Sequence, residues 1–185
     1  VDLGVGVGWQ KEEYDACGLD FANRGRLLDH TLEVCQTIWT QPSAQYNANE
    51  LQFSDIHAMP KPLQNGGVPI WVSGTVNKLS MRRLATFGCG WIPWGPDAND
   101  ITSGIESMRK AVSAYGRDPD EIQVIGTLPI TRNDDGIDLD VTMSNVPELV
   151  TAGVTDFRAY LPVPDGLDPA TEYLTDVVKR FNDCI

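Results

Sequence analysis

Short apolar runs alternate along the chain with segments of helical periodicity. The apolar runs predict strands because they are brief and are bounded by glycine, proline or polar residues. The longer segments between them predict helices because their apolar residues recur at helical spacing and several of them stop at a glycine. The expected strands are "LGVGVG" (3–8), "VPIWVSG" (68–74), "CGWIPWG" (89–95), "EIQVIGTLPI" (121–130) and "DFRAYLPV" (156–163).

Helical patterns follow each of these runs. A short helix is expected in "KEEYDACGLDF", which stops at Gly18, and a longer one in residues 23–42, which Pro42 ends. Residues 43–67 predict an irregular excursion with a short hairpin around Leu51 to Phe53. Further helices are expected at 75–88, 97–116, 143–153 and 168–183, the last with Asp168 placed as its cap.

A strand–helix alternation repeated five times predicts βαβ units and a parallel sheet in one α/β domain, residues 1–185. Ligands of such proteins collect at the carboxyl ends of the strands. That rule selects four places in the sequence: Gly6–Trp9, Ser73–Asn77, Pro93–Pro96 and Leu128–Arg132.

Glycines alternate in the first strand, at Gly4, Gly6 and Gly8. Glycine weakens a strand, and strict alternation places all three on one face, so that face carries no side chains. Two interpretations stay open: bulky neighbours crowd the strand, or the strand end is cleared for a flat ring. The spacing does not fit the G-x-G-x-x-G fingerprint of dinucleotide-binding folds.

The segment "VSGTVNK" places Ser73, Gly74 and Thr75 between a buried strand and the start of a helix. A helix start offers free N–H groups and the positive end of its dipole to an anion, and Lys78 adds a charge if it points back. Ser and Thr are equally favoured as ordinary helix caps with no ligand. The segment therefore predicts either a phosphate site or a cap.

Two tryptophans lie in the third expected strand, "CGWIPWG". We expect Trp91 and Trp94 to face the same way, with Trp94 the better candidate for lining a pocket. His57 is interpreted as a solvated loop histidine, and "RNDDGIDLD" (132–140) as a polar turn because it lacks the spacing of a calcium loop.

Net charge restricts the partners. The formal charge of −12 argues against nucleic acid and anionic membrane surfaces, which require basic patches. Four scattered cysteines and two histidines make a metal site improbable and favour a reducing cytoplasm. A small-molecule substrate is expected.

Several stretches together resemble the luciferase-like family of flavin- and F420-dependent oxidoreductases. "LGVGVGWQKEEYDACGLDFANRGRLLDHTLEVCQTIW" is similar to the family's glycine-rich strand and following helices, "FSDIHAMPKPLQNGGVPIWVSG" to its "P.P.Q….PIWVGG" segment, and "RRLATFGCGWIP" to its "A...GDGW.P". The resemblance extends to about Pro129. The chain departs from the pattern at Ser73, where the family often has Gly, and at Cys89, where it often has Asp.

The resemblance implies a TIM-type (β/α)8 barrel, of which this chain holds about five βα units, strands 4 to 8. It implies a cofactor, F420 or alternatively FMN, at the carboxyl-end face, with the ring near the first strand and the phosphate against the loop after the second. The cofactor contacts it implies are Gly6, Val7, Gly8, Val72, Ser73, Gly74, Thr75, Trp94 and Gly95. No catalytic acid or base is assigned.

The expected activity is hydride transfer between F420 and a small organic substrate. The alternatives are an FMN/O₂-dependent monooxygenase of the same fold, a noncatalytic flavin-binding barrel remnant and, with less support, an unrelated barrel enzyme acting on a sugar phosphate. Because an open barrel exposes a sheet edge, we expect a homo-oligomer or association with the N-terminal barrel half that is missing here.

Overall fold

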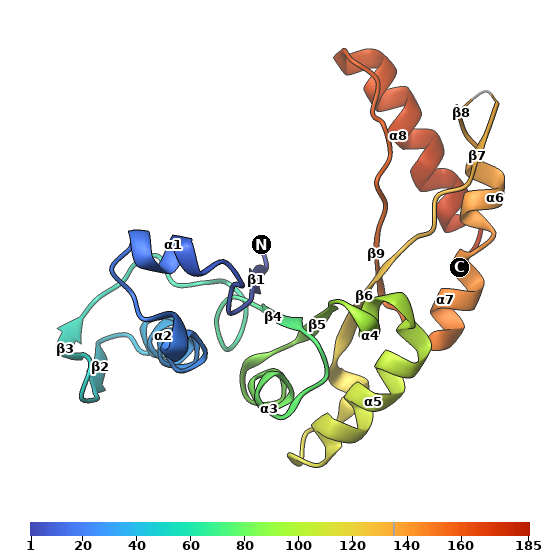
Figure 1. Ribbon diagram of the computed structural model, residues 1–185. Helices are drawn as coiled ribbons and strands as arrows, with labels where there is room; N and C mark the ends of the chain where they lie inside the picture. The colour runs from blue at the N-terminus through green and yellow to red at the C-terminus, as the bar shows by residue number, and fades with distance from the viewer. Residues whose placement is uncertain (135) are drawn as a thin grey trace.

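One parallel sheet organises the computed structural model, which describes residues 1–134 and 136–185 (Figure 1). The strand order is β1-β4-β5-β6-β9, and each neighbouring pair is parallel. The molecule is elongated, with α1, α2 and the β2–β3 hairpin at one end and α6, α7 and α8 at the other. The strands are β1 (Leu3–Val5), β4 (Ile70–Gly74), β5 (Gly90–Pro93), β6 (Gln123–Thr127) and β9 (Asp156–Arg158).

Helices fill the connections between these strands. They are α1 (Lys11–Ala16), α2 (Arg24–Thr40), α3 (Lys78–Phe87), α4 (Pro96–Asn99), α5 (Ile101–Ser113), α6 (Leu139–Met143), α7 (Val146–Ala152) and α8 (Leu167–Asn182), with 3-10 turns at Phe21–Asn23 and Pro119–Glu121. Two antiparallel hairpins project from this frame: β2 (Ala44–Asn47) with β3 (Gln52–Ile56), and β7 (Arg132–Asn133) with β8 (Gly136–Ile137).

Strand order in the sheet follows chain order without a reversal. A doubly wound sheet reverses its order at a switch point, whereas a barrel adds each strand to the same side. Right-handed crossovers then place the connecting helices on one face of the sheet. The expected α/β class with a parallel, barrel-type sheet is confirmed.

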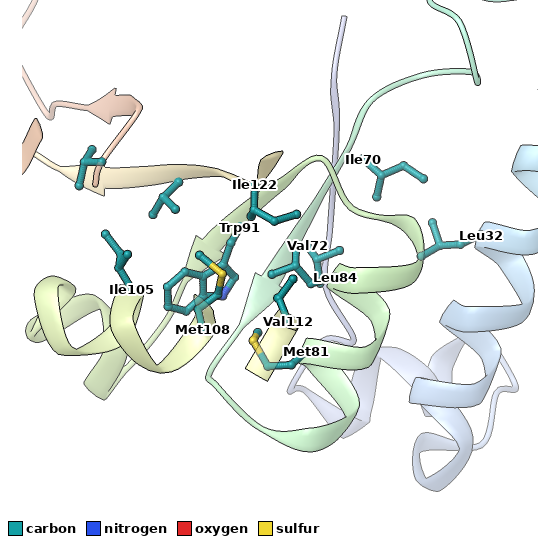
Figure 2. Close-up of a cluster of buried hydrophobic side chains, with 12 residues drawn as sticks. Leu32, Ile70, Val72, Met81, Leu84, Trp91, Ile105, Met108, Val112 and Ile122 are labelled. Carbon is teal, nitrogen blue, oxygen red and sulfur yellow. The ribbon is translucent and has the colours of Figure 1, made fainter. Parts of the chain in front are cut away.

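The core lies between that face and the helices. Val72 and Trp91 point from β4 and β5 toward α3 and α5, and both are fully buried (Figure 2). Leu32 of α2 joins the same cluster. The remaining labelled members are Ile70, Met81, Leu84, Ile105, Met108, Val112 and Ile122.

The opposite face of the sheet carries glycines, the half-buried Ile92 and the buried Trp71. Gly4 is exposed and Ile92 is half-buried. Trp71 lies over Gly90, where a Cβ would come within 2.3 Å of the indole ring. Glycine is therefore required at position 90 to accommodate the ring.

Several element boundaries differ from the sequence-based expectation. The first strand ends at Val5, and Gly8 has a φ of +68°, so strand geometry does not continue through the glycine run. Asp100 divides the segment 97–116 into α4 and α5 by accepting a hydrogen bond from the Ser103 N–H. The excursion contains a longer hairpin than expected, and Leu51 lies in its turn.

Corrections also apply near the C-terminus. Asp168 is not the cap of α8: Gly166 holds that position with a φ of +94°, and Asp168 lies in the first turn. The expected helix 143–153 corresponds to α7, and a separate helix that was not expected, α6, precedes it from Leu139. The strand from Asp156 ends at Arg158, and part of the expected polar turn, residue 135, lies outside the described residues. No helix in residues 1–134 and 136–185 has the length and apolar character of a membrane span.

Candidate functional site

A cavity of about 1170 Å³ opens beside the carboxyl ends of β1, β4 and β5. It is lined by residues 4–9, 22–26, 73–75 and 82–83, and by Asp29, Asn77, Leu79, Ser80, Ile92 and Trp94. Of the nine residues expected at a cofactor, seven line it: Gly6, Val7, Gly8, Ser73, Gly74, Thr75 and Trp94. Val72 is instead buried in the core, and Gly95 is not among the lining residues.

The glycine face of the first strand is open toward this cavity. A Cβ at Gly4 would lie 3.5 Å from Ile92 Cδ1, and a Cβ at Gly6 would lie 3.6 Å from Ser73 Cβ. Both distances are ordinary van der Waals contacts, so crowding by neighbours does not require glycine at either position. The bare surface is available to a ligand.

Gly8 has a different role from the other two glycines. Its φ of +68° favours glycine, and a Cβ there would lie 3.3 Å from the Tyr14 ring. The Tyr14 hydroxyl donates a 2.7 Å hydrogen bond to the Val7 carbonyl. Tyr14 of α1 thus fixes the path of the backbone where it leaves β1.

The loop between β4 and α3 is held by its own side chains. Asn77 caps α3, since its Oδ1 accepts hydrogen bonds from the N–H groups of Leu79 (3.0 Å) and Ser80 (3.1 Å). The Val76 N–H donates to Asp97 Oδ2 at 2.7 Å. Of the two interpretations left open for this segment, a cap by Ser73 or Thr75 is therefore excluded, and the helix start offers fewer free donors than the sequence suggests. Lys78 is not among the cavity-lining residues.

Trp91 and Trp94 lie in opposite environments, contrary to the expectation that they face the same way. Trp91 lies within β5, whereas Trp94 lies just beyond the end of that strand at Pro93, so the alternation of side chains along a strand does not extend to Trp94. Trp91 is buried, and its Nε1 donates a 2.9 Å hydrogen bond to the Gly74 carbonyl. Trp94 is 61% exposed and lines the cavity, as does Trp9, which is 77% exposed.

The cavity is also lined by four arginines, which the sequence analysis did not identify. They are Arg24 and Arg26 of α2, and Arg82 and Arg83 of α3. Asp29 joins the last two. Its Oδ1 accepts a 2.6 Å hydrogen bond from Arg83 Nε, and its Oδ2 accepts one from Arg82. Arg83 is only 4% exposed and also donates to the Gly25 carbonyl at 3.0 Å.

Other sequence candidates lie away from the cavity. His57 is exposed and pairs with Asp55 at 2.9 Å in the excursion. The loop after β6 does not contribute, and its Leu128 is buried in a second apolar cluster. In the part of the chain that the structure describes, no group of three or more His, Cys, Asp or Glu could hold a metal ion.

The chemistry of this lining is that of a binding site. Within the described residues, Asp29 is the one carboxylate that lines the cavity, and no histidine, cysteine or tyrosine lines it. Asp29 is committed to two arginines. The cavity therefore offers flat apolar walls, hydroxyls and positive charge, which suit a planar anionic molecule.

Comparison with known proteins identifies the family and the fold. The family model of luciferase-like monooxygenases matches residues 1–138. An uncharacterized protein of Mycobacterium tuberculosis is 28% identical over 182 residues, which are 98% of this chain and 58% of that protein. The chain thus spans less than two thirds of the length of this relative.

Solved structures share the fold. The monooxygenase RslO1 from Streptomyces bottropensis matches 100% of this chain and 67% of its own, with a TM-score of 0.63 and 16% identity. An F420-dependent secondary alcohol dehydrogenase in complex with an F420–acetone adduct matches 100% of this chain and 61% of its own, with a TM-score of 0.56 and 14% identity. The chain belongs to the luciferase-like monooxygenase family.

Proposed function

We propose that this chain contributes the cofactor-binding face of an oxidoreductase that moves a hydride between F420 and a small organic substrate. The supporting observation is that Gly4 in β1 and Gly6 just beyond it line the cavity, although packing does not require glycine at either position. Gly6, Ser73 and Trp94 line the cavity. When bound, a deazaflavin supplies the hydride chemistry.

In this proposal the chain binds and orients the ring, and it excludes water from one side of it. Gly6, Val7 and Gly8 would hold the ring, while Ser73, Gly74 and Thr75 would receive its anionic group in the loop before α3. The exposed aromatic surface of Trp94 would contact the ring. A pocket with flat apolar walls and a few polar groups is typical of cofactor sites.

An FMN- and O₂-dependent monooxygenase is the second candidate. It is supported by the description of the matching family and by the fold shared with the monooxygenase RslO1. Both candidates use the same cavity. They are separated by titrating the purified protein with F420 and with FMN, each followed by absorbance and by thermal shift. A chain that binds flavin without turnover of any substrate would fit the noncatalytic remnant.

Gly6→Leu tests the site more sharply than a change at Gly74. The φ of Gly74 is +152°, so any side chain there strains the backbone, whereas a Cβ at Gly6 meets only ordinary contacts. We expect Gly6→Leu to weaken binding of whichever cofactor responds by tenfold or more, about 1.4 kcal/mol. Thr151→Leu adds the same side chain on exposed α7 and serves as the matched control. If Gly6→Leu and the parent bound the cofactor with equal affinity, the proposed cofactor site would be wrong.

The partners follow from the sheet. In the described residues β1 and β9 are edge strands, and an uncovered edge invites pairing. We propose that residues 1–185 form a partial barrel domain completed by a second copy or by an N-terminal barrel half. Light scattering of the chain, with and without a co-expressed N-terminal half, distinguishes these two.

Four unpaired thiols further support a cytoplasmic location.

A further inference from the structure

We propose that the arginines of α2 and α3 form a second anion subsite in the cavity, which binds a carboxylate or phosphate carried by the same ligand. This inference rests on the proposed function and adds a ligand class to it: molecules with two separated anionic groups. The second subsite is centred on Arg24 and on the Arg82–Asp29–Arg83 group.

Charge distribution is the first argument. The chain has 14 Lys and Arg against 26 Asp and Glu. Four of those cations nevertheless line one cavity, together with a single carboxylate among the described lining residues. A strongly acidic chain that concentrates arginine at one concave surface focuses a positive field there. That field attracts an anionic ligand.

Pairing of the individual arginines locates the uncompensated charge. Asp29 is shared between Arg82 and Arg83, which leaves one net positive charge on the three groups. Arg26 is neutralised by Glu50, which does not line the cavity. Arg24 has no carboxylate within ion-pair distance in residues 1–134 and 136–185.

Arg24 is held in place by its own loop. Its guanidinium lies 3.9 Å from the centre of the Phe21 ring, and its Nη1 donates a 2.9 Å hydrogen bond to the Phe21 carbonyl. Its Nε is buried and has no hydrogen-bond partner in the described part of the chain. A bound oxygen anion would accept hydrogen bonds from guanidinium donors other than Nε and the one that bonds to Phe21, and the fixed side chain would lose little entropy on binding.

The two subsites are separated along α3. Lys78 begins the helix next to the Ser73–Thr75 loop, whereas Arg82 and Arg83 lie four and five residues later. At about 1.5 Å of rise per residue, this corresponds to roughly 6–8 Å along the helix axis. This figure is the separation of the backbone positions along the helix. We infer that a ligand that engages both ends carries two anionic groups.

The test uses inorganic pyrophosphate and citrate as probes, with titration calorimetry at low and high salt. We expect binding of at least one probe, weakened by salt, and the tighter probe identifies phosphate or carboxylate as the preferred group. Arg24→Gln and Arg82→Gln should each weaken it about tenfold or more. Arg24→Lys should recover part of the loss. Arg109→Gln on α5, outside the cavity, is the matched control.

Glu50→Gln gives a change of opposite sign. It frees Arg26 from its exposed partner, so the probe should bind about two- to threefold more tightly. Absence of probe binding to the parent, or affinities of Arg24→Gln and Arg82→Gln within twofold of the parent, would overturn the inference. If Arg24→Gln does not fold, the probe affinity of Arg82→Gln alone tests the inference.

Failure of the proposed function gives a different pattern. If the proposed function is correct, Gly6→Leu should weaken the cofactor response by tenfold or more while pyrophosphate or citrate binding persists. A parent that binds the probe but neither F420 nor FMN would retain the second anion subsite and remove the proposed cofactor.

Discussion

Trp91 joins the core to the cavity, and its replacement by Phe tests that connection. The indole is fully buried and donates to the Gly74 carbonyl at 2.9 Å. Trp91→Phe leaves that carbonyl without this donor, at a cost of about 1–3 kcal/mol, and removes about 1–2 kcal/mol of apolar burial. The sum is roughly 2–4 kcal/mol after partial relaxation, which lowers Tm by roughly 5–15 °C in a chain of this size.

Trp94→Phe supplies the comparison three residues away. Trp94 is 61% exposed, so its replacement should change the unfolding free energy by less than about 0.5 kcal/mol while weakening cofactor binding. Thermal melts followed by circular dichroism measure both variants. Equal melting temperatures for Trp91→Phe and Trp94→Phe would refute the division of roles between the two tryptophans.

Three further outcomes are expected. Asp29→Asn leaves the buried Arg83 without its carboxylate, so urea unfolding should show a loss of about 3 kcal/mol. Hydrogen bonds at the start of α5 hold the pKa of Asp100 below its usual range, so Asp100→Ala should lower Tm near pH 7, and the difference should vanish as the pH falls through that lowered pKa. Burial raises the pKa of the Cys89 thiol, so iodoacetamide at pH 8 should label exposed Cys17 first, as mass spectrometry would show.

The parallel sheet could be predicted from the sequence because its central strands are continuous apolar runs. "VPIWVSG" and "CGWIPWG" contain β4 and β5. Between them, α3 ends at Phe87, just before Gly88, which closes its helical pattern. Strand ends were harder to predict. The run from Asp156 stays extended and apolar, yet its ladder ends at Arg158 because that residue pairs with Thr127, the last residue of β6. Pairing length depends on the neighbouring strand.

Part of the cavity could be predicted for a similar reason. Strand ends in a parallel sheet converge by geometry, so the loops at Gly6 and Gly74 reach the same cavity. The arginines of α2 and α3 do not follow from that rule. Asp29 and Arg83 are 54 residues apart in sequence, and their contact depends on how two helices pack. Local pattern carries no information on that packing.

The strand order has a consequence for association. All five strands run in the same direction, so the outer edge of β9 in one molecule matches in polarity the outer edge of β1 in another. Such a contact joins two different surfaces, head to tail. In a row of associated molecules, one free β1 edge remains at one end and one free β9 edge at the other. Growth then stops only if the curvature brings the last edge back to the first; otherwise a filament extends with concentration.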